Sequence, residues 1–240
     1  MSEAIMTNEF TLDGFRSPVT VDLNEMITKE DLLQFRAFQT WRDTLQKNLE
    51  RQHNDAQHAF HEDPFVLKKV KIQSVDCFPG TKVAFVKLKA EIRNKQNQEL
   101  PGIAFLRGGS VAVLMILRPV DSTDERWVVM TEQPRVPAGS LSFVEIPAGM
   151  LDDEGNFAGK AAKEIMEETG FKLPEGELID LTELALAPGP APEGMAPKGE
   201  SIQEKECLQN AMYPSPGGSD EFIPIFLWEK VLLALDVFPT

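Results

Sequence analysis

The spacing of hydrophobic positions changes character along the chain. In residues 31–52 the apolar side chains recur every three or four positions, at Leu32, Phe35, Phe38, Trp41, Leu45 and Leu49. This period predicts one amphipathic helix. Packing on the chain's own core and a dimer contact are equally consistent with its apolar face. Residues 1–29 show little periodicity, and we expect them to be partly disordered.

Alternating and continuous apolar runs follow the helix and predict strands. Residues 65–92 alternate, with Pro79 and Gly80 as a turn, which is typical of an antiparallel sheet. Two apolar runs then predict core strands, at 108–119 (GGSVAVLMILRP) and 126–136 (RWVVMTEQPRV). Further strands are expected at 177–186 (ELIDLTELAL) and 221–230 (EFIPIFLWEK).

These patterns divide the chain into three expected parts. Residues 1–62 form an N-terminal segment with the amphipathic helix, and residues 63–107 form an antiparallel β segment. Residues 108–240 form the third part. A run of prolines between residues 187 and 219 predicts a long loop inside this last part.

Charge and composition restrict the class of partner. The chain has 240 residues and a formal net charge of −14, so general nucleic-acid and membrane-surface binding are disfavoured. A small anionic substrate would need a local cation or metal ion to approach. Two cysteines make no disulfide framework, and the first ten residues, MSEAIMTNEF, carry no basic targeting pattern. We therefore expect a cytoplasmic protein.

Three glutamates crowd into one short predicted helix, AAKEIMEETGF at residues 161–171. At about 100° per residue, Glu164, Glu167 and Glu168 share one face. Like charges four positions apart disfavour an isolated helix by roughly 0.2–0.5 kcal/mol. A solvated acidic face is one interpretation of the three glutamates. The other is a site for Mg²⁺ or Mn²⁺, which prefer clustered carboxylate oxygens and would neutralise them.

The residues around the glutamates fit a helix that lies close to a sheet. A narrow stripe of small and apolar side chains runs beside the acidic face, at Ala158, Ala161, Ala162 and Ile165. Gly170 is expected to end the helix in the left-handed conformation.

The longer stretch EIPAGMLDDEGNFAGKAAKEIMEETGF, residues 145–171, resembles the Nudix box. The spacing is kept from Gly149 through the glutamates to the closing Gly170 and Phe171. Two positions depart from the pattern, because Gly155 stands where the first glutamate belongs and Lys163 replaces an arginine. The resemblance implies a Nudix α/β/α sandwich with a mixed sheet, to which the N-terminal antiparallel β segment and the preceding helix are added.

The resemblance also implies roles for individual residues. Mg²⁺, or Mn²⁺ in its place, would be held by the backbone carbonyl of Ala148 and by Glu164 and Glu168, and Glu167 would support the cluster. Lys163 keeps the charge of the arginine but not its two-pronged geometry.

Four further segments resemble the ADP-sugar and nucleotide-sugar pyrophosphatase branch of the family: RGGSVAVLMIL, TEQPRVPAG, IPAGMLDD and YPSPGGSDEF. The implied reaction is Mg²⁺-dependent hydrolysis of the pyrophosphate bond of a nucleoside diphosphate sugar. Arg135, Glu132 and Gly149 would contact the substrate, and Glu221 would act as a catalytic carboxylate. An ion pair of Arg135 with Asp152 or Asp153 is the alternative for that arginine, and turn formation alone would explain the glycines before Glu221.

Members of this branch are dimers, so the resemblance implies a homodimer. The implied binding partner is a small-molecule nucleotide sugar, with no nucleic acid and no membrane. Nothing after Lys230 resembles the strand, acidic loop and helix with which relatives continue. The resemblance therefore implies a C-terminally short Nudix hydrolase domain at residues 108–240, and we expect its activity to be weak or absent. Hydrolysis of another nucleoside diphosphate derivative is a competing hypothesis. A dinucleotide-polyphosphate or coenzyme A hydrolase is a further rival, which the TEQPR and GGSDE segments disfavour. A non-catalytic Nudix module that binds ADP-ribose-like ligands is another, and metal-dependent turnover would discriminate it.

Overall fold

The computed structural model describes residues 8–80, 82–151, 158–159, 162, 169–171, 173–187 and 206–232. These residues divide into two compact units. Unit 1 is drawn from residues 8–108, 206–209 and 215–221, and unit 2 from residues 109–187, 210–214 and 222–232. Neither unit is a continuous stretch of chain. The three-part division expected from the sequence stays a prediction.

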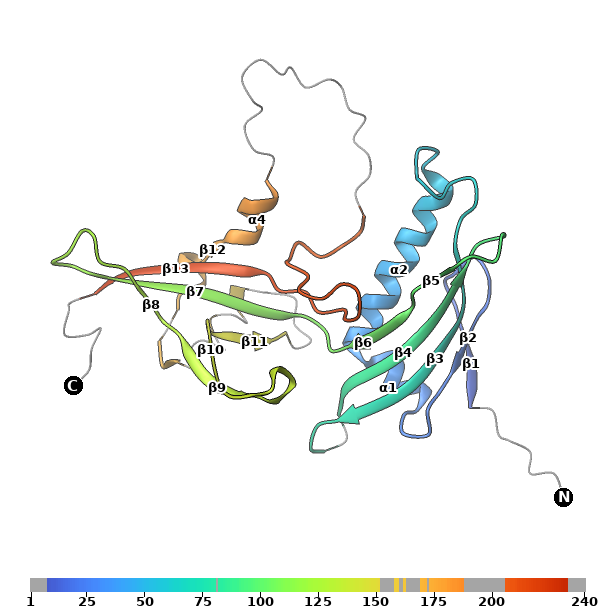
Figure 1. Ribbon diagram of the computed structural model, residues 1–240, viewed down its shortest axis with the longest axis horizontal. Helices are drawn as coiled ribbons and strands as arrows, with labels where there is room; N and C mark the ends of the chain where they lie inside the picture. Colours follow the sequence, from blue (N-terminus) through green and yellow to red (C-terminus); the bar gives the residue numbers. More distant parts are fainter. Residues whose placement is uncertain are drawn as a thin grey trace, which may run out of the picture. The chain divides into compact units, whose positions relative to one another are not determined.

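Unit 1 is a mixed six-stranded sheet with two helices (Figure 1). Its elements are β1 (Glu9–Leu12), β2 (Val19–Asp22), α1 (Lys29–Gln34), α2 (Arg36–Asn54), β3 (Val66–Cys77), β4 (Val83–Arg93), β5 (Glu99–Leu100) and β6 (Ile103–Leu106). The strand order is β1-β2-β3-β4-β5, with β6 also paired to β4, and only the β2–β3 pair is parallel. The predicted antiparallel sheet around Pro79 and Gly80 is confirmed as the β3–β4 hairpin.

The helix α2 lies on one face of this sheet and closes the core of unit 1 (Figure 1). Leu32 from α1 and Phe38 from α2 are both fully buried, as are Leu67, Val86 and Leu88 from the sheet. The apolar face of the predicted helix therefore packs on the chain's own core, which was one of its two interpretations.

One expectation for the N-terminal region is wrong and another stays a prediction. Of residues 1–29, expected to be partly disordered, residues 1–7 lie outside the described residues, while Glu9–Leu12 and Val19–Asp22 form strands and Val19 and Val21 are fully buried. The single predicted helix is two helices, since Phe35 adopts an extended conformation (φ −67°, ψ 112°) between α1 and α2. The Thr28 side chain accepts the N–H of Asp31 and fixes the start of α1.

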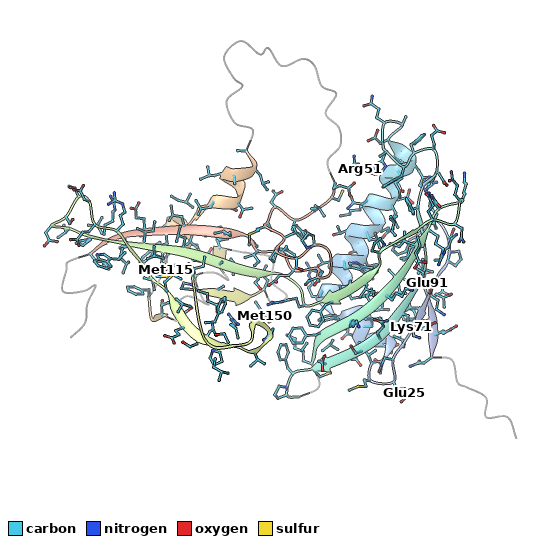
Figure 2. The ribbon with its side chains drawn as sticks, viewed as in Figure 1. Glu25, Arg51, Lys71, Glu91, Met115 and Met150 are labelled. Carbon is cyan, nitrogen blue, oxygen red and sulfur yellow. The ribbon has the colours of Figure 1, made fainter. Side chains whose placement is uncertain are left out.

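Unit 2 contains a mixed five-stranded sheet and a separate two-stranded hairpin. Its elements are β7 (Ser110–Pro119), β8 (Trp127–Val128), β9 (Thr131–Arg135), η1 (Val136–Ala138), β10 (Ser140–Glu145), β11 (Ala148–Met150), η2 (Glu175–Glu177), β12 (Ile179–Asp180), α4 (Leu181–Leu186) and β13 (Ile225–Leu232). The larger sheet runs β11-β7-β13-β12, with β8 also paired to β7. Met115 on β7 and Met150 on β11, both labelled in Figure 2, belong to adjacent strands of it.

The central strand β7 was predicted and is confirmed. It is antiparallel to β11 and parallel to β13, which also confirms the strand expected in residues 221–230. Val111, Val113, Met115 and Leu117 carry the apolar core of the unit together with Trp228.

Two other expectations for unit 2 are wrong. Residues 126–136 are not one core strand: they split into β8 and β9, and Trp127 and Val128 are 43% and 48% exposed. The strand expected at 177–186 is confirmed only at Ile179–Asp180, which is β12. Residues 181–186 form the helix α4 instead, because Asp180 caps it by accepting the N–H of Glu183 (2.8 Å). Among the described residues, no helix is long and apolar enough to cross a membrane. The described fold is a mixed α/β structure with few helices.

Candidate functional site

The predicted glutamate helix lies mostly outside the described residues, and so do Glu164, Glu167 and Glu168. The residues around it fit the prediction. Ala158 and Ala162 are helical and pack against the core of unit 2, as the small-residue stripe predicted. Gly170 has a φ of 76°, the left-handed conformation expected where the helix ends.

The register of β11 decides where the backbone of Ala148 points. The Val113 N–H donates to the Pro147 carbonyl (3.0 Å), and the Leu151 N–H donates to the Gly109 carbonyl (2.9 Å). In an antiparallel pair the bonded positions alternate, so Ala148 falls between bonded positions and its N–H and C=O point away from β7. Since β11 is the edge of the described sheet, this carbonyl is directed outward from the sheet edge.

Arg135 ends β9 and forms an ion pair that the sequence did not predict. Its Nε donates to Glu145 Oε1 (2.7 Å), and its Nη2 also contacts that carboxylate. Gln133 donates to the same oxygen (2.9 Å). The Arg135 side chain is 40% exposed, while that of Glu145 is 21% exposed. A partly exposed guanidinium fixed along one edge keeps further N–H groups with which to bind an anion.

Glu132 lies on the other face of the same strand. Side chains alternate along β9, and the structure places Thr131, Gln133 and Arg135 on the more buried face, with Glu132 exposed opposite them. Glu132 accepts a hydrogen bond from the Ser142 hydroxyl. Two of the expected substrate contacts, Arg135 and Glu132, are therefore not brought together. Gly149, the third, lies in β11 directly after Ala148.

Glu221, the expected catalytic carboxylate of the GGSDE segment, belongs to unit 1. Its Oε1 forms an ion pair with Arg107 Nη1 (2.9 Å), and its side chain is 17% exposed. The preceding Asp220 accepts the N–H groups of Arg107 (2.8 Å) and Gly108 (3.2 Å). Burial raises the pKa of Asp220, while these N–H groups and the Arg107 charge act in the opposite direction.

The donors implied for a divalent metal fit its chemistry as far as they are described. A backbone carbonyl that is free of the sheet ladder is a hard oxygen ligand of the type that Mg²⁺ accepts. The two carboxylates expected beside it, Glu164 and Glu168, lie outside the described residues. Within the described part of the chain, no group of three or more His, Cys, Asp or Glu side chains could hold a metal ion.

Sequence reasoning missed Glu145 and Arg107. Glu145 could have been found by pairing the TEQPR segment with SLSFVE as a hairpin, because Glu145 then faces Thr131 on the same side as Arg135. Gly139, with a φ of 72°, supplies the tight connection between these strands. Arg107 had no comparable signal, since its partner Glu221 lies more than a hundred residues away in the sequence.

Two known proteins are similar to this chain in sequence. The chain is 36% identical over 233 residues to the chloroplastic Nudix hydrolase 14 of Arabidopsis thaliana, which covers 95% of this chain and 65% of that protein. It is 30% identical over 123 residues to the ADP-ribose pyrophosphatase of Bacillus subtilis (strain 168), covering 51% of this chain and 46% of that protein. No family model matches the chain. The chain spans between about half and two thirds of the length of these relatives.

A solved structure of an ADP compounds hydrolase is also similar, at 14% sequence identity and a TM-score of 0.39, covering 72% of this chain and 75% of that chain.

The expected cytoplasmic location is wrong by this comparison, because the relative that covers 95% of the chain is named as chloroplastic. That expectation rested on the lack of a targeting pattern in the first ten residues, and such a lack specifies no compartment.

The box spacing, the left-handed Gly170 and the 36% identity along 95% of the chain agree with one another. The chain belongs to the Nudix hydrolase family.

Proposed function

We propose that this chain hydrolyses the pyrophosphate bond of nucleoside diphosphate sugars, of the ADP-ribose, ADP-glucose or UDP-glucose type, with Mg²⁺ as cofactor. The products are a nucleoside monophosphate and a sugar phosphate. Unit 2 carries the metal-binding and substrate-binding residues of this proposal within an α/β/α sandwich of the Nudix type. The printed name of the B. subtilis relative, an ADP-ribose pyrophosphatase, supports the substrate class.

The observation that carries the proposal is the direction of the Ala148 carbonyl. The β11–β7 register leaves this carbonyl outside the ladder at the sheet edge, just before the glutamate segment. This supports its proposed role as an oxygen ligand. Glu164 and Glu168 would complete the ligand set, with Glu167 supporting it. When bound, Mg²⁺ neutralises the diphosphate and lowers the pKa of water.

Arg135 supplies the substrate contact for which the structure gives most support. Glu145 and Gln133 fix its side chain from the neighbouring strand positions, so the guanidinium is oriented before the substrate arrives. Preorganised cations of this kind bind phosphate oxygens with two parallel hydrogen bonds. Gly149 and Glu132 remain weaker candidates, and Glu132 would have to act from the opposite face of β9.

The reaction needs one proton acceptor. Water adds to one phosphorus, the bridging P–O bond breaks, and its electron pair leaves with the other phosphate. The proton of the water passes to a carboxylate, for which Glu167 and Glu221 are the proposed candidates.

Chromatography of the products tests the proposal directly. Purified protein is incubated with ADP-ribose, ADP-glucose and UDP-glucose, each with Mg²⁺ and each with a chelator. We expect AMP or UMP only in the presence of Mg²⁺. Binding of these compounds by folded protein without any turnover would instead support a non-catalytic module.

Substitutions connect the activity to the proposed ligands. Glu164→Gln and Glu168→Gln should each lower kcat by about a hundredfold or more while the protein stays folded, because removal of one strong electrostatic contact to a transition state commonly costs that much. Glu183→Gln on α4 is the matched control, since this exposed carboxylate is not among the proposed metal ligands. Equal rates for all three variants would refute the ligand assignment.

A homodimer is the assembly proposed with this function. Light scattering coupled to size-exclusion chromatography would give its mass, and a monomer that hydrolyses the substrates would refute the dimer without affecting the reaction.

A further inference from the structure

A cavity lined mostly by polar residues lies in unit 1, and none of these residues has a part in the proposed hydrolysis. Its volume is about 280 Å³. Since one water molecule occupies about 30 Å³ in the liquid, an anion the size of several water molecules fits inside. The cavity is formed where the end of α2, the loop after it, the start of β3 and the end of β4 meet.

Basic side chains dominate the lining of this cavity. Its ionisable members are His53, His61, Glu62, Lys68, Arg93 and Lys95. Apart from the histidines, the lining holds three cations and one carboxylate. The chain as a whole has the opposite balance, with 24 lysines and arginines against 38 acidic residues. The cavity is therefore a local reversal of the charge of the protein.

The cations of the lining differ in how far they are neutralised. Arg93 donates to Asn97 Oδ1 (3.2 Å) and pairs with the Glu99 carboxylate. Lys68 and Lys95 are exposed, and among the described residues neither takes part in an ion pair within 4.0 Å. These two ammonium groups are accordingly the strongest candidates for binding an anion.

The backbone that carries these side chains is held in place. The buried Gln52 accepts the N–H of Phe65 (2.8 Å) through its side chain, and its backbone carbonyl contacts His61 Nδ1 (2.9 Å). Because a carbonyl only accepts, Nδ1 carries the hydrogen and Nε2 is left for another partner. Asp63 accepts the backbone N–H of Lys95 (3.0 Å), which fixes the turn after β4.

The electrostatic environment of His53 agrees with a positive cavity. Burial is the largest cause that lowers the pKa of His53, and the charges of Arg16, His61 and Lys95 lower it further, while Glu50 opposes them. A cation is therefore disfavoured there. The two histidines and Glu62 are also not among any group that could hold a metal ion, within the described residues.

We propose that this cavity binds a phosphate group between Lys68 and Lys95, either as inorganic phosphate or as the phosphate of a small monoester. Ammonium groups bind phosphate through charge-assisted hydrogen bonds and suit it as compact point charges. Glu62 opposes the anion and sets an upper limit on affinity. The site is independent of the proposed hydrolysis, and its function is to bind an anion in the N-terminal unit.

Isothermal titration of the full chain with inorganic phosphate, in the presence of a chelator, tests the site without catalysis. The double variant Lys68→Gln/Lys95→Gln should bind phosphate about tenfold more weakly or not at all, because two nearby unit charges are removed. Lys71→Gln is the matched control: Lys71, labelled in Figure 2, is an exposed lysine of the same strand as Lys68 and is not part of the lining.

The variant Glu62→Gln should have the opposite effect from the lysine variant. Because it removes the negative charge of the lining, it should tighten phosphate binding several-fold. It keeps the test decisive even if the double variant were unfolded. Undetectable binding at millimolar phosphate, an equal loss in Lys71→Gln, or an unchanged affinity in both Glu62→Gln and the double variant would overturn the proposal.

A second titration with a hexose monophosphate separates the two sources of the anion. Equal affinities identify free phosphate as sufficient, whereas tenfold tighter binding of the ester identifies a monoester as the ligand. Both results support the site provided that the lysine and glutamate variants change them as stated.

Discussion

Asp220 shows how a single residue combines a structural role with an electrostatic cost. Its carboxylate accepts two successive backbone N–H groups, those of Arg107 and Gly108, directly before the chain passes into β7. Burial nevertheless raises its pKa. The folded protein therefore holds this proton more tightly than the unfolded chain does. As the pH rises from about 3.8 through the raised value, this group lowers the free energy of unfolding.

Removing the charge of Asp220 while keeping a hydrogen-bond acceptor should remove this loss of stability at neutral pH. We expect Asp220→Asn to be as stable as the parent or more stable by up to about 1 kcal/mol at pH 7, with the difference vanishing near pH 4. Urea unfolding at the two pH values measures it. Asp220→Ala removes both acceptors and should destabilise by about 1–3 kcal/mol. A loss of stability in Asp220→Asn that is larger at pH 7 than at pH 4 would contradict this explanation.

Single residues were predicted best where their role is local. Gly170 was expected in the left-handed conformation from its place after the helix, and its φ of 76° confirms it. The partners of Arg135 and Glu221 were not predicted, because both ion pairs depend on which strands lie together. Periodicity assigns a side chain to a face, but it does not give the neighbouring strand.

Close contact between strands controls stability at the scale of elements. Gly102 immediately precedes β6, and a Cβ atom added there would lie 2.0 Å from the carbonyl oxygen of Ala90 in β4. The Ala90 N–H already donates to the Gly102 carbonyl (2.8 Å), so the two backbones are held together. No flexible side chain can move aside to relieve the overlap.

Gly102→Ala should therefore destabilise unit 1 by about 2 kcal/mol or more, as overpacking against backbone commonly does. Gly218→Ala is the control in the same unit, because a Cβ there meets nothing within 4 Å. Thermal unfolding should separate the two variants clearly. Equal melting temperatures would show that β6 can shift away from β4 at little cost.

Helices and strands were predicted correctly where the hydrophobic pattern was long. They were missed where a helix cap or a position at a sheet edge determined the local structure. The β3–β4 hairpin and β7 follow directly from their apolar patterns. The helix α4 was expected as a strand because ELIDLTELAL is apolar and β-branched at its start, but the Asp180 cap begins a helix there. The short strand β8 retains an exposed tryptophan, so hydrophobicity alone overstated its burial.

Net charge is the property that acts on the whole molecule. With a formal net charge of −14, the folded chain carries an excess of like charges that repel one another. Raising the salt concentration from about 10 mM to about 150 mM shortens the screening length from about 30 Å to about 8 Å. The repulsion between distant carboxylates should then weaken.

We expect the melting temperature to rise over this range of sodium chloride. Chloride is used instead of phosphate so that the proposed anion site is not occupied at the same time. An uncharged osmolyte at equal osmolarity should have a smaller effect. A fall in melting temperature would mean that ion pairs such as Lys69–Asp22 (2.6 Å) outweigh the general repulsion.

The mixed α/β class was predicted through the resemblance of residues 145–171 to the Nudix box. The composition of the two units was not, because each one takes residues from distant parts of the chain. Residues 215–221 belong with unit 1, where the Gly218 carbonyl accepts the N–H of Phe105 (2.8 Å). The local hydrophobic pattern does not show that a late segment of the chain packs with an early one.

The parallel pairing of β7 with β13 also has a consequence during synthesis. Ala112 faces Ile225, so the two strands are separated by about 110 residues of chain. At about 5–20 residues per second, a ribosome needs roughly 5–20 s to pass from one strand to the other. Throughout that interval the nascent β7 lacks its β13 partner, so the apolar strand keeps one edge unpaired and open to association with other strands.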